Sequence, residues 1–398
     1  MKKRTIAKTG ATMLTMAMLL NGTTVFAAGT SYQEVKGGST KFDKYLVMDQ
    51  EANVPNASFT YTIAPGTKKI YDVNNKKVEV LAGVGTPKMT DEDTTTEGFQ
   101  LVFQPTDTLN KTLKTGDNVK DFDPTKQGYA KKTSTVDFSG VTFTEPGIYR
   151  YVITETGKNQ AVTNDTNDKR YLDVYVIDKN GDLEVSGYIL HATDSEVGMK
   201  DSHGSDGIQK DNKSQGFTNT YDTSNLTFKK EVSGNQASRD KYFEFTVEIK
   251  KAVPGTVYNV DITGATETSG SNAATIEANA NKANLRELKV GADGTVTQKF
   301  YLQHGQYITI QGIAKESTYT VTENEEDYKS AAAAVENYKD LTTGTVASID
   351  LKTSYLNTRD GVIPTGVIMT VAPFAAVTLL GAAGMVTIKM RKKEDDAE

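Results

Sequence analysis

The chain has 398 residues, no cysteine and no tryptophan, with 37% hydrophobic residues, 24% charged residues and a net charge of −6. This length is typical of two or three domains, and the composition indicates folded cores rather than disorder. The lack of cysteine excludes disulfides and thiolate chemistry, and the acidic balance disfavours a nucleic-acid partner. No metal or other cofactor is expected, because the sequence has no catalytic triad order, no phosphate loop and no zinc-ligand spacing among its three histidines. Those histidines are His191, His203 and His304.

Residues 1–27 are typical of a secretory signal peptide. A basic start precedes an apolar run over residues 11–20, and Val25-Phe26-Ala27 forms a small-x-small exit. We place the cleavage after Ala27. The alternative, an N-terminal membrane anchor, would need a longer apolar stretch than this one. The sequence therefore predicts an exported protein.

The interior has β character, because short runs rich in Thr, Val, Tyr, Phe and Ile alternate with polar residues and end at Gly, Asn, Asp or Pro. Many short strands with turn signals favour β-sandwich domains, and we expect one over residues 28–222 and a second over residues 223–361. Only a few stretches, such as 330–338, have helical character. The Asp-rich run 165–168 lacks a calcium-loop pattern and predicts a surface turn.

An internal repeat supports two domains. Lys44 precedes Phe59 by fifteen positions, and Lys230 precedes Phe245 by the same number. A later Tyr-x-x-x-Glu run ends at a glutamate in each half, and each half closes with an asparagine.

In each half, one lysine, one glutamate and one asparagine share a strand face with mostly apolar or aromatic residues. Taken singly, the lysine would reach solvent at a strand end, the glutamate would lie on a rim and the asparagine would occupy a turn. Their recurrence in the same order favours a buried triad in each domain instead. The two triads are Lys44, Glu155 and Asn219, and Lys230, Glu323 and Asn357.

Such a triad has a specific chemistry. Burial lowers the pKa of a lysine and raises the pKa of a glutamate. A neutral amine is a nucleophile, and a protonated carboxyl group can bond to the asparagine carbonyl and move protons. Attack of the amine on the amide carbon would release ammonia and join lysine to asparagine in a single-turnover reaction that needs no cofactor. Glu155 and Glu323 are the predicted proton-transfer groups.

The C-terminal residues 362–398 carry a second processing signal. The apolar segment 367–388 is long enough to span a bilayer as a helix, and the basic residues after it would keep that end in the cytoplasm. The preceding run Val362-Ile363-Pro364-Thr365-Gly366 resembles the sorting signals of Gram-positive surface proteins. The resemblance implies sortase cleavage between Thr365 and Gly366, with Pro364 fixing an extended bend.

Over nearly its whole length the chain resembles the backbone pilins of Gram-positive bacteria, of the streptococcal T-antigen type. The similarity is carried by the runs 143–155, 217–219, 232–235 and 302–306, and by the sorting motif with residues 367–374. It implies two tandem immunoglobulin-like β-sandwiches. It also implies isopeptide bonds Lys44–Asn219, with Glu155, and Lys230–Asn357, with Glu323.

The resemblance further implies polymerisation. A pilin-specific sortase would join Thr365 of one subunit to a lysine of the next, here Lys213 with Lys210 as the alternative, since Asn212 stands at the matching position. Expected partners are identical subunits, accessory pilins and peptidoglycan, the last through a housekeeping sortase. The exported protein would be part of a cell-wall-anchored surface pilus, and its C-terminal helix would anchor it in the membrane only transiently. The alternative function is a monomeric cell-wall adhesin or minor pilin.

Overall fold

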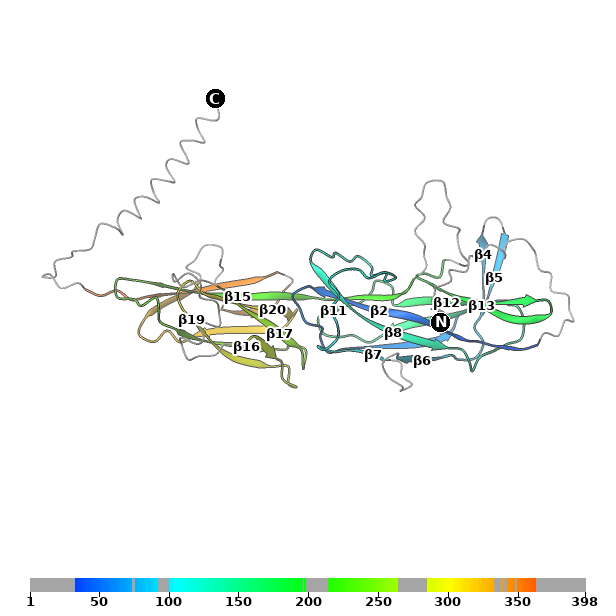
Figure 1. The fold of residues 1–398 in the computed structure, drawn as a ribbon, viewed down its shortest axis with the longest axis horizontal. Helices are drawn as coiled ribbons and strands as arrows, with labels where there is room; N and C mark the ends of the chain where they lie inside the picture. The colour runs from blue at the N-terminus through cyan, green and yellow to red at the C-terminus, as the bar shows by residue number, and fades with distance from the viewer. Residues whose placement is uncertain are drawn as a thin grey trace, which may run out of the picture.

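The computed structural model describes residues 33–73, 76–91, 100–195, 197, 214–263, 285–332, 338, 342–347 and 349–362. These residues form two β-sandwiches that lie end to end along the long axis of the molecule (Figure 1). The expected all-β class is confirmed, because the described ranges contain strands and no helix. Within them no helix meets the length and apolarity that a membrane crossing requires. The signal peptide and residues 363–398 lie outside the described residues.

The first sandwich packs a seven-stranded sheet against a five-stranded sheet. The order in the larger sheet is β13 (Asp182–His191), β12 (Lys169–Lys179), β10 (Gly147–Thr156), β3 (Ala57–Pro65) and β7 (Gln100–Phe103), with β5 (Lys76–Ala82) joining β10 and β4 (Lys69–Val73) joining β5. The order in the smaller sheet is β11 (Val162–Thr163), β14 (Gly216–Tyr221), β2 (Ser39–Asp49), β8 (Gln127–Asp137) and β6 (Lys88–Asp91). A short separate pair joins β1 (Val35–Lys36) to β9 (Thr142–Phe143).

The second sandwich has six strands facing four. The order in the six-stranded sheet is β18 (Glu287–Lys289), β17 (Val257–Thr263), β20 (Tyr307–Ala314), β15 (Thr223–Ser233), β24 (Leu351–Thr358) and β22 (Lys329–Ala332). The order in the four-stranded sheet is β19 (Val296–Leu302), β16 (Phe243–Lys250), β21 (Thr318–Glu323) and β23 (Thr343–Thr345).

Both cores follow from strand alternation. In β14 and β16 the buried positions are every second residue, so each strand presents one apolar face to the facing sheet. Strand β2 is different, because Tyr45 and Val47 on its outer face are also buried. A cluster of these two residues with Val119, Tyr129 and Phe122 covers that face. Residues 44–48 of this long central strand are therefore buried on both faces.

One local prediction is wrong. Residues 330–338 were expected to have helical character, yet residues 330–332 belong to β22, which pairs antiparallel with β24. The alanines there have high helix propensity, but the free edge of β24 offers main-chain hydrogen bonds that override a preference of a few tenths of a kcal/mol per residue. Residues 333–337 lie outside the described part of the chain.

The two sandwiches meet at a tight junction. Only Asp222 separates β14 from β15, and the core cluster of the first sandwich includes Val253 and Ala314 of the second. Across the junction Asn53 donates to the main-chain oxygen of Val257 at 3.0 Å and to the side chain of Asn259 at 2.9 Å. The junction is thus packed and hydrogen-bonded rather than a free linker.

Candidate functional site

The structure brings Lys44, Glu155 and Asn219 together inside the first sandwich. Lys44 lies on β2 and Asn219 on β14, two adjacent parallel strands. Phe217 is the residue opposite Lys44, so Asn219 lies two residues further along the same face. Glu155 reaches them from β10 of the facing sheet. The site is therefore built across both layers of the sandwich.

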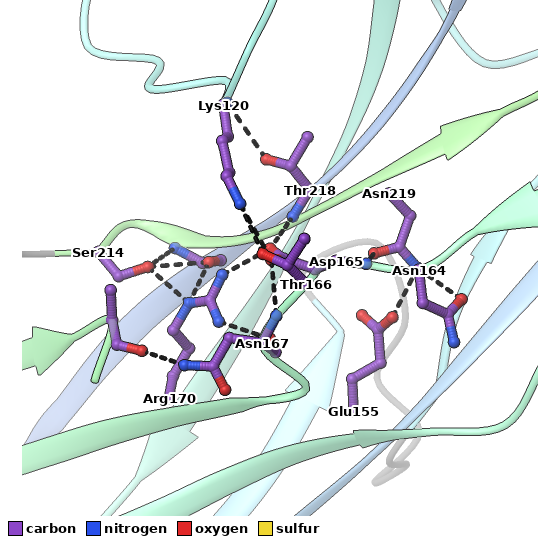
Figure 2. A network of polar contacts seen from close by, with 12 residues as sticks. Lys120, Glu155, Asn164, Asp165, Thr166, Asn167, Arg170, Ser214, Thr218 and Asn219 are labelled. Atoms are coloured by element: carbon purple, nitrogen blue, oxygen red, sulfur yellow. Dashed lines mark hydrogen bonds and ion pairs between the residues drawn. The ribbon is translucent and has the colours of Figure 1, made fainter. Parts of the chain in front are cut away.

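Glu155 bridges the other two side chains. Its Oε2 accepts a hydrogen bond from Lys44 Nζ at 2.6 Å and another from the hydroxyl of Tyr61 at 2.7 Å. Its Oε1 accepts from Asn219 Nδ2 at 2.6 Å, a contact visible in Figure 2. The lysine and glutamate side chains are 0% and 3% exposed, and Asn219 is 0% exposed. The amine and the amide thus share one carboxylate in a space without water access.

The second sandwich repeats this arrangement. Lys230 on β15 lies opposite Tyr355 of the parallel strand β24, and Asn357 again follows two residues later. Glu323 on β21 comes from the facing sheet, and its Oε1 lies 2.6 Å from Lys230 Nζ and accepts from Asn357 Nδ2 at 3.1 Å. Both sandwiches therefore hold the same three residue types at the same strand register.

Burial shifts the pKa of three of these groups. Desolvation lowers the pKa of both lysines, Lys44 and Lys230, from 10.5 to about 8, although the neighbouring glutamates act in the opposite direction. Desolvation also raises the pKa of Glu323, against the pull of Lys230. At pH 7 about one in ten such amines is neutral, several hundred times the fraction of an ordinary lysine. The site therefore supplies a nucleophile and a proton carrier at contact distance.

Lys131 lies close to two carboxylates but, unlike Lys44 and Lys230, is not fully buried. Lys131 on β8 lies 2.9 Å from Asp43 and 2.8 Å from Asp117, but its side chain is 31% exposed. Partial burial alone would lower its pKa, yet the hydrogen bonds to the two carboxylates outweigh this and raise it. Lys131 stays an ammonium ion and cannot attack, so proximity to carboxyl groups does not by itself make a reactive lysine.

The aromatic residues over the two lysines correct the sequence repeat. Lys44 Nζ lies 4.2 Å from the ring centre of Phe59, but Lys230 Nζ lies over Phe243, at 4.3 Å, and not over Phe245. Phe245 pairs with Glu323 in the place that Tyr61 holds opposite Glu155. The equal spacing of fifteen residues is therefore not a structural equivalence. The second site also lacks the tyrosine hydroxyl that binds Glu155 in the first.

A polar network beside Asn219 was not found from the sequence. Asp165, expected in a surface turn, has a side chain only 3% exposed and pairs with Arg170 at 2.6 Å. Its carboxylate also accepts from the main chain of Thr218, next to Asn219 on β14, at 3.0 Å. Figure 2 shows this network running from Lys120 to Asn219. A charged residue in a turn carries no sequence signal that distinguishes such a buried position from an exposed one.

The arrangement can perform one kind of reaction. In each of the two buried sites an amine, an amide and a carboxyl group are in contact. Held at contact, an amine and an amide can exchange ammonia for lysine without a bound cofactor. The residues predicted to link subunits and to be cleaved lie outside the described residues; they are Lys210, Lys213, Pro364, Thr365 and Gly366.

Comparison with known proteins gives matches over most of the chain. Residues 40–222 match the family described as the Spy0128-like isopeptide containing domain, and residues 224–359 match a domain family of unknown function, DUF7601. A pilin of Streptococcus pyogenes serotype M1 is 27% identical over 397 residues, covering 94% of this chain and 98% of that protein. The crystal structure of the major pilin from S. pyogenes has a TM-score of 0.49 at 22% identity, covering 82% of this chain and 100% of that one. The T3.2 major pilin from S. pyogenes has a TM-score of 0.47 at 21% identity, covering 82% and 99%.

Proposed function

We propose that this chain is the structural subunit of a surface pilus and that each subunit cross-links itself through two lysine–asparagine amides. The chain is a homologue of a streptococcal pilin, and its own residues 40–222 match the Spy0128-like isopeptide containing domain. The bonds are Lys44–Asn219 and Lys230–Asn357. The observation that carries the proposal is the pair of buried triads at the same strand register in both sandwiches.

Each bond forms in one turnover. The neutral lysine amine attacks Cγ of the asparagine, the new C–N bond forms, and the old bond to Nδ2 breaks. The glutamate carries a proton from the lysine nitrogen to the leaving nitrogen, which departs as ammonia. The contacts of Glu155 and Glu323 support this role, because each contacts both nitrogens, at 2.6 Å and 2.6 Å in the first site and 2.6 Å and 3.1 Å in the second.

Intact mass measurement tests the bonds. Recombinant residues 28–361 should weigh two ammonia molecules less than calculated from the sequence. Glu155→Ala and Glu323→Ala should each restore one ammonia, because the proton carrier is lost while the amine and amide remain. A full calculated mass for the unaltered protein would remove the basis of the proposal.

Polymerisation completes the function. After removal of residues 1–27, a pilin-specific sortase would cleave after Thr365 and pass its carbonyl to Lys213 of the next subunit, or to Lys210. A housekeeping sortase would attach the finished fibre, with its accessory pilins, to peptidoglycan. Native cells should show high-molecular-weight ladders on denaturing gels, and Lys213→Ala, or Lys210→Ala, should abolish them. A single band from native cells would instead favour a wall-anchored monomer, the adhesin or minor-pilin alternative.

A further inference from the structure

The two ends of the Asn219 amide are held by different groups. Nδ2 donates to Glu155, and Oδ1 accepts a hydrogen bond of 3.0 Å from the main-chain N–H of Asp165 (Figure 2). A second, longer contact joins Nδ2 to Oδ1 of Asn164 at 3.3 Å. The amide is thereby fixed in one orientation, with its oxygen turned toward the turn between β11 and β12 and its nitrogen toward the carboxylate.

This orientation matters because of where charge develops. When an amine attacks Cγ, the electron pair of the C=O bond moves onto Oδ1 before the bond to Nδ2 breaks. A preorganised N–H about 2.7 to 3.1 Å from the place that this oxygen takes in the intermediate stabilises the oxyanion, and removal of one such donor in other acyl-transfer sites slows reaction by about 10²–10³-fold. The main-chain N–H of Asp165 lies 3.0 Å from Oδ1 of the amide before attack, so it is already directed at the oxygen on which the charge develops.

The side chain of Asp165 holds this main-chain donor in place. Its carboxylate accepts from the main-chain N–H groups of Thr218 at 3.0 Å and Asn167 at 3.2 Å, and pairs with Arg170 at 2.6 Å. Burial alone would raise its pKa, but the Thr218 hydrogen bond and the Arg170 charge outweigh burial and lower the pKa. Asp165 thus binds β14 at two adjacent points, the Asn219 oxygen and the Thr218 nitrogen.

The second site is built differently. Asn357 Oδ1 is buried and has no hydrogen-bond partner among the described residues. Its Nδ2 lies 3.1 Å from the same Glu323 oxygen that pairs with Lys230, whereas the first site uses separate oxygens for amine and amide. Glu323 is supported by the hydroxyl of Ser330 at 3.3 Å. The described part of the second domain offers no counterpart to the Asp165 donor.

We infer that the main-chain N–H of Asp165 is an oxyanion donor specific to the first bond, and that the Asp165 carboxylate holds this N–H in position. The Lys44–Asn219 bond therefore forms faster than the Lys230–Asn357 bond. This rests on the proposed function, since it concerns the rate of the same two bonds. The reaction balances as before: lysine amine and asparagine amide give one secondary amide and one ammonia.

The test follows both bonds in full-length chain made by cell-free translation. Samples are quenched in acid at intervals, digested, and the two cross-linked peptides are quantified by mass spectrometry. In the unaltered chain the first bond should form at least tenfold faster. Equal rates, or a faster second bond, would overturn the inference. If neither linked peptide ever forms, the proposed function fails instead, so the two failures are distinguishable.

Position 165 is then altered in two steps. Asp165→Ala keeps the main-chain N–H at position 165 but removes the carboxylate. The same translation system can insert lactic acid at this position, which has the side chain of alanine but an ester oxygen in place of the main-chain N–H. The lactate chain should form the first bond at least tenfold more slowly than Asp165→Ala, with the second bond unchanged. Identical rates for this pair would refute the donor role, whatever Asp165→Ala does alone.

Two further variants separate positioning from general damage. Asp165→Asn, which retains an acceptor for Thr218, should recover part of the rate lost in Asp165→Ala. The matched control is Asp178→Ala, which removes another turn-stabilising carboxylate, bonded to the N–H of Gly181 at 2.7 Å, in the same sandwich. It should leave both rates unchanged. An equal slowing by Asp178→Ala would show that the effect is structural. If the altered chains do not fold, the comparison of the two bonds in the unaltered chain still decides.

Discussion

Replacing Asn219 by alanine would remove one proposed cross-link and leave a free Lys44 amine, 2.6 Å from Glu155. The loop that the bond closes holds about 175 residues, for which the chain-entropy relation gives a loss of about 5 kcal/mol in the free energy of unfolding. The lost hydrogen bond between the Asn219 oxygen and the turn adds about 1 kcal/mol. For a domain of this size about 5 kcal/mol corresponds to a fall in Tm of about 10–20 °C.

Calorimetry combined with intact mass checks this prediction. The variant should show one ammonia more than the unaltered protein, after correction for the substitution, and the first domain should melt at the lower temperature. Asn164→Ala is the matched control, because Asn164 contacts the same amide at 3.3 Å but forms no bond. It should keep the mass deficit and lose only about 1 kcal/mol. A fall in Tm for Asn219→Ala no greater than for this control would refute the assignment of the loop constraint.

Three other outcomes are expected. In the Asn219→Ala background, the free energy of unfolding, measured by urea titration, should rise by about 3 kcal/mol from pH 8 to 10.5. The reason is that the unfolded chain keeps the Lys44 proton up to its ordinary pKa of 10.5, while the folded chain loses it at a pKa of about 8. A flat profile, relative to the same chain with Lys44→Met, would contradict the lowered pKa. Asp173→Ala should cost about 3 kcal/mol in the same titration, the lower end of the cost of breaking a buried ion pair, because the buried Arg150 guanidinium loses two contacts of 2.7 Å but keeps Asp194 at 2.9 Å; Asp178→Ala should cost under about 1 kcal/mol. Equal losses would count against the buried pair. Gly312→Ala should loosen the domain junction, seen as a broader distribution of lengths in X-ray scattering, because its φ is 72° and an added Cβ would lie 2.8 Å from a main-chain atom of the other sandwich. An unchanged scattering profile would refute the claim that the junction depends on the close contact at Gly312.

Strand parity explains how much of the site could be predicted. Lys44, Glu155 and Asn219 each fall on an apolar face of a β-strand, and alternation alone indicates burial once the strand is recognised. The pairing of Lys44 with Asn219, and of Lys230 with Asn357, was implied by the resemblance to pilins and not by strand alternation. The two sandwiches and the six buried side chains were therefore within reach of the sequence.

The remainder depends on contacts that parity cannot supply. Arg150 and Asp173 lie on the outer face of their sheet, where solvent would be expected, but Tyr71 of the β4–β5 hairpin and Asp194 cover Arg150. The Asp165 donor is a main-chain group, which any residue type could provide. The fifteen-residue spacing failed because the distance along the chain between two strands depends on the length of the connection, which differs between the domains.

The register of the triads also determines how tension would travel through the molecule. Each proposed bond would join the first long strand of a sandwich to the last one, so a force that pulls on the two ends of a domain would pass through a single amide and bypass the strands between. At about 3.4 Å per extended residue, about 600 Å of chain in the first sandwich and about 430 Å in the second could never be drawn out. A fibre of such subunits would resist stretching at nearly constant length until covalent bonds break, instead of lengthening by domain unfolding.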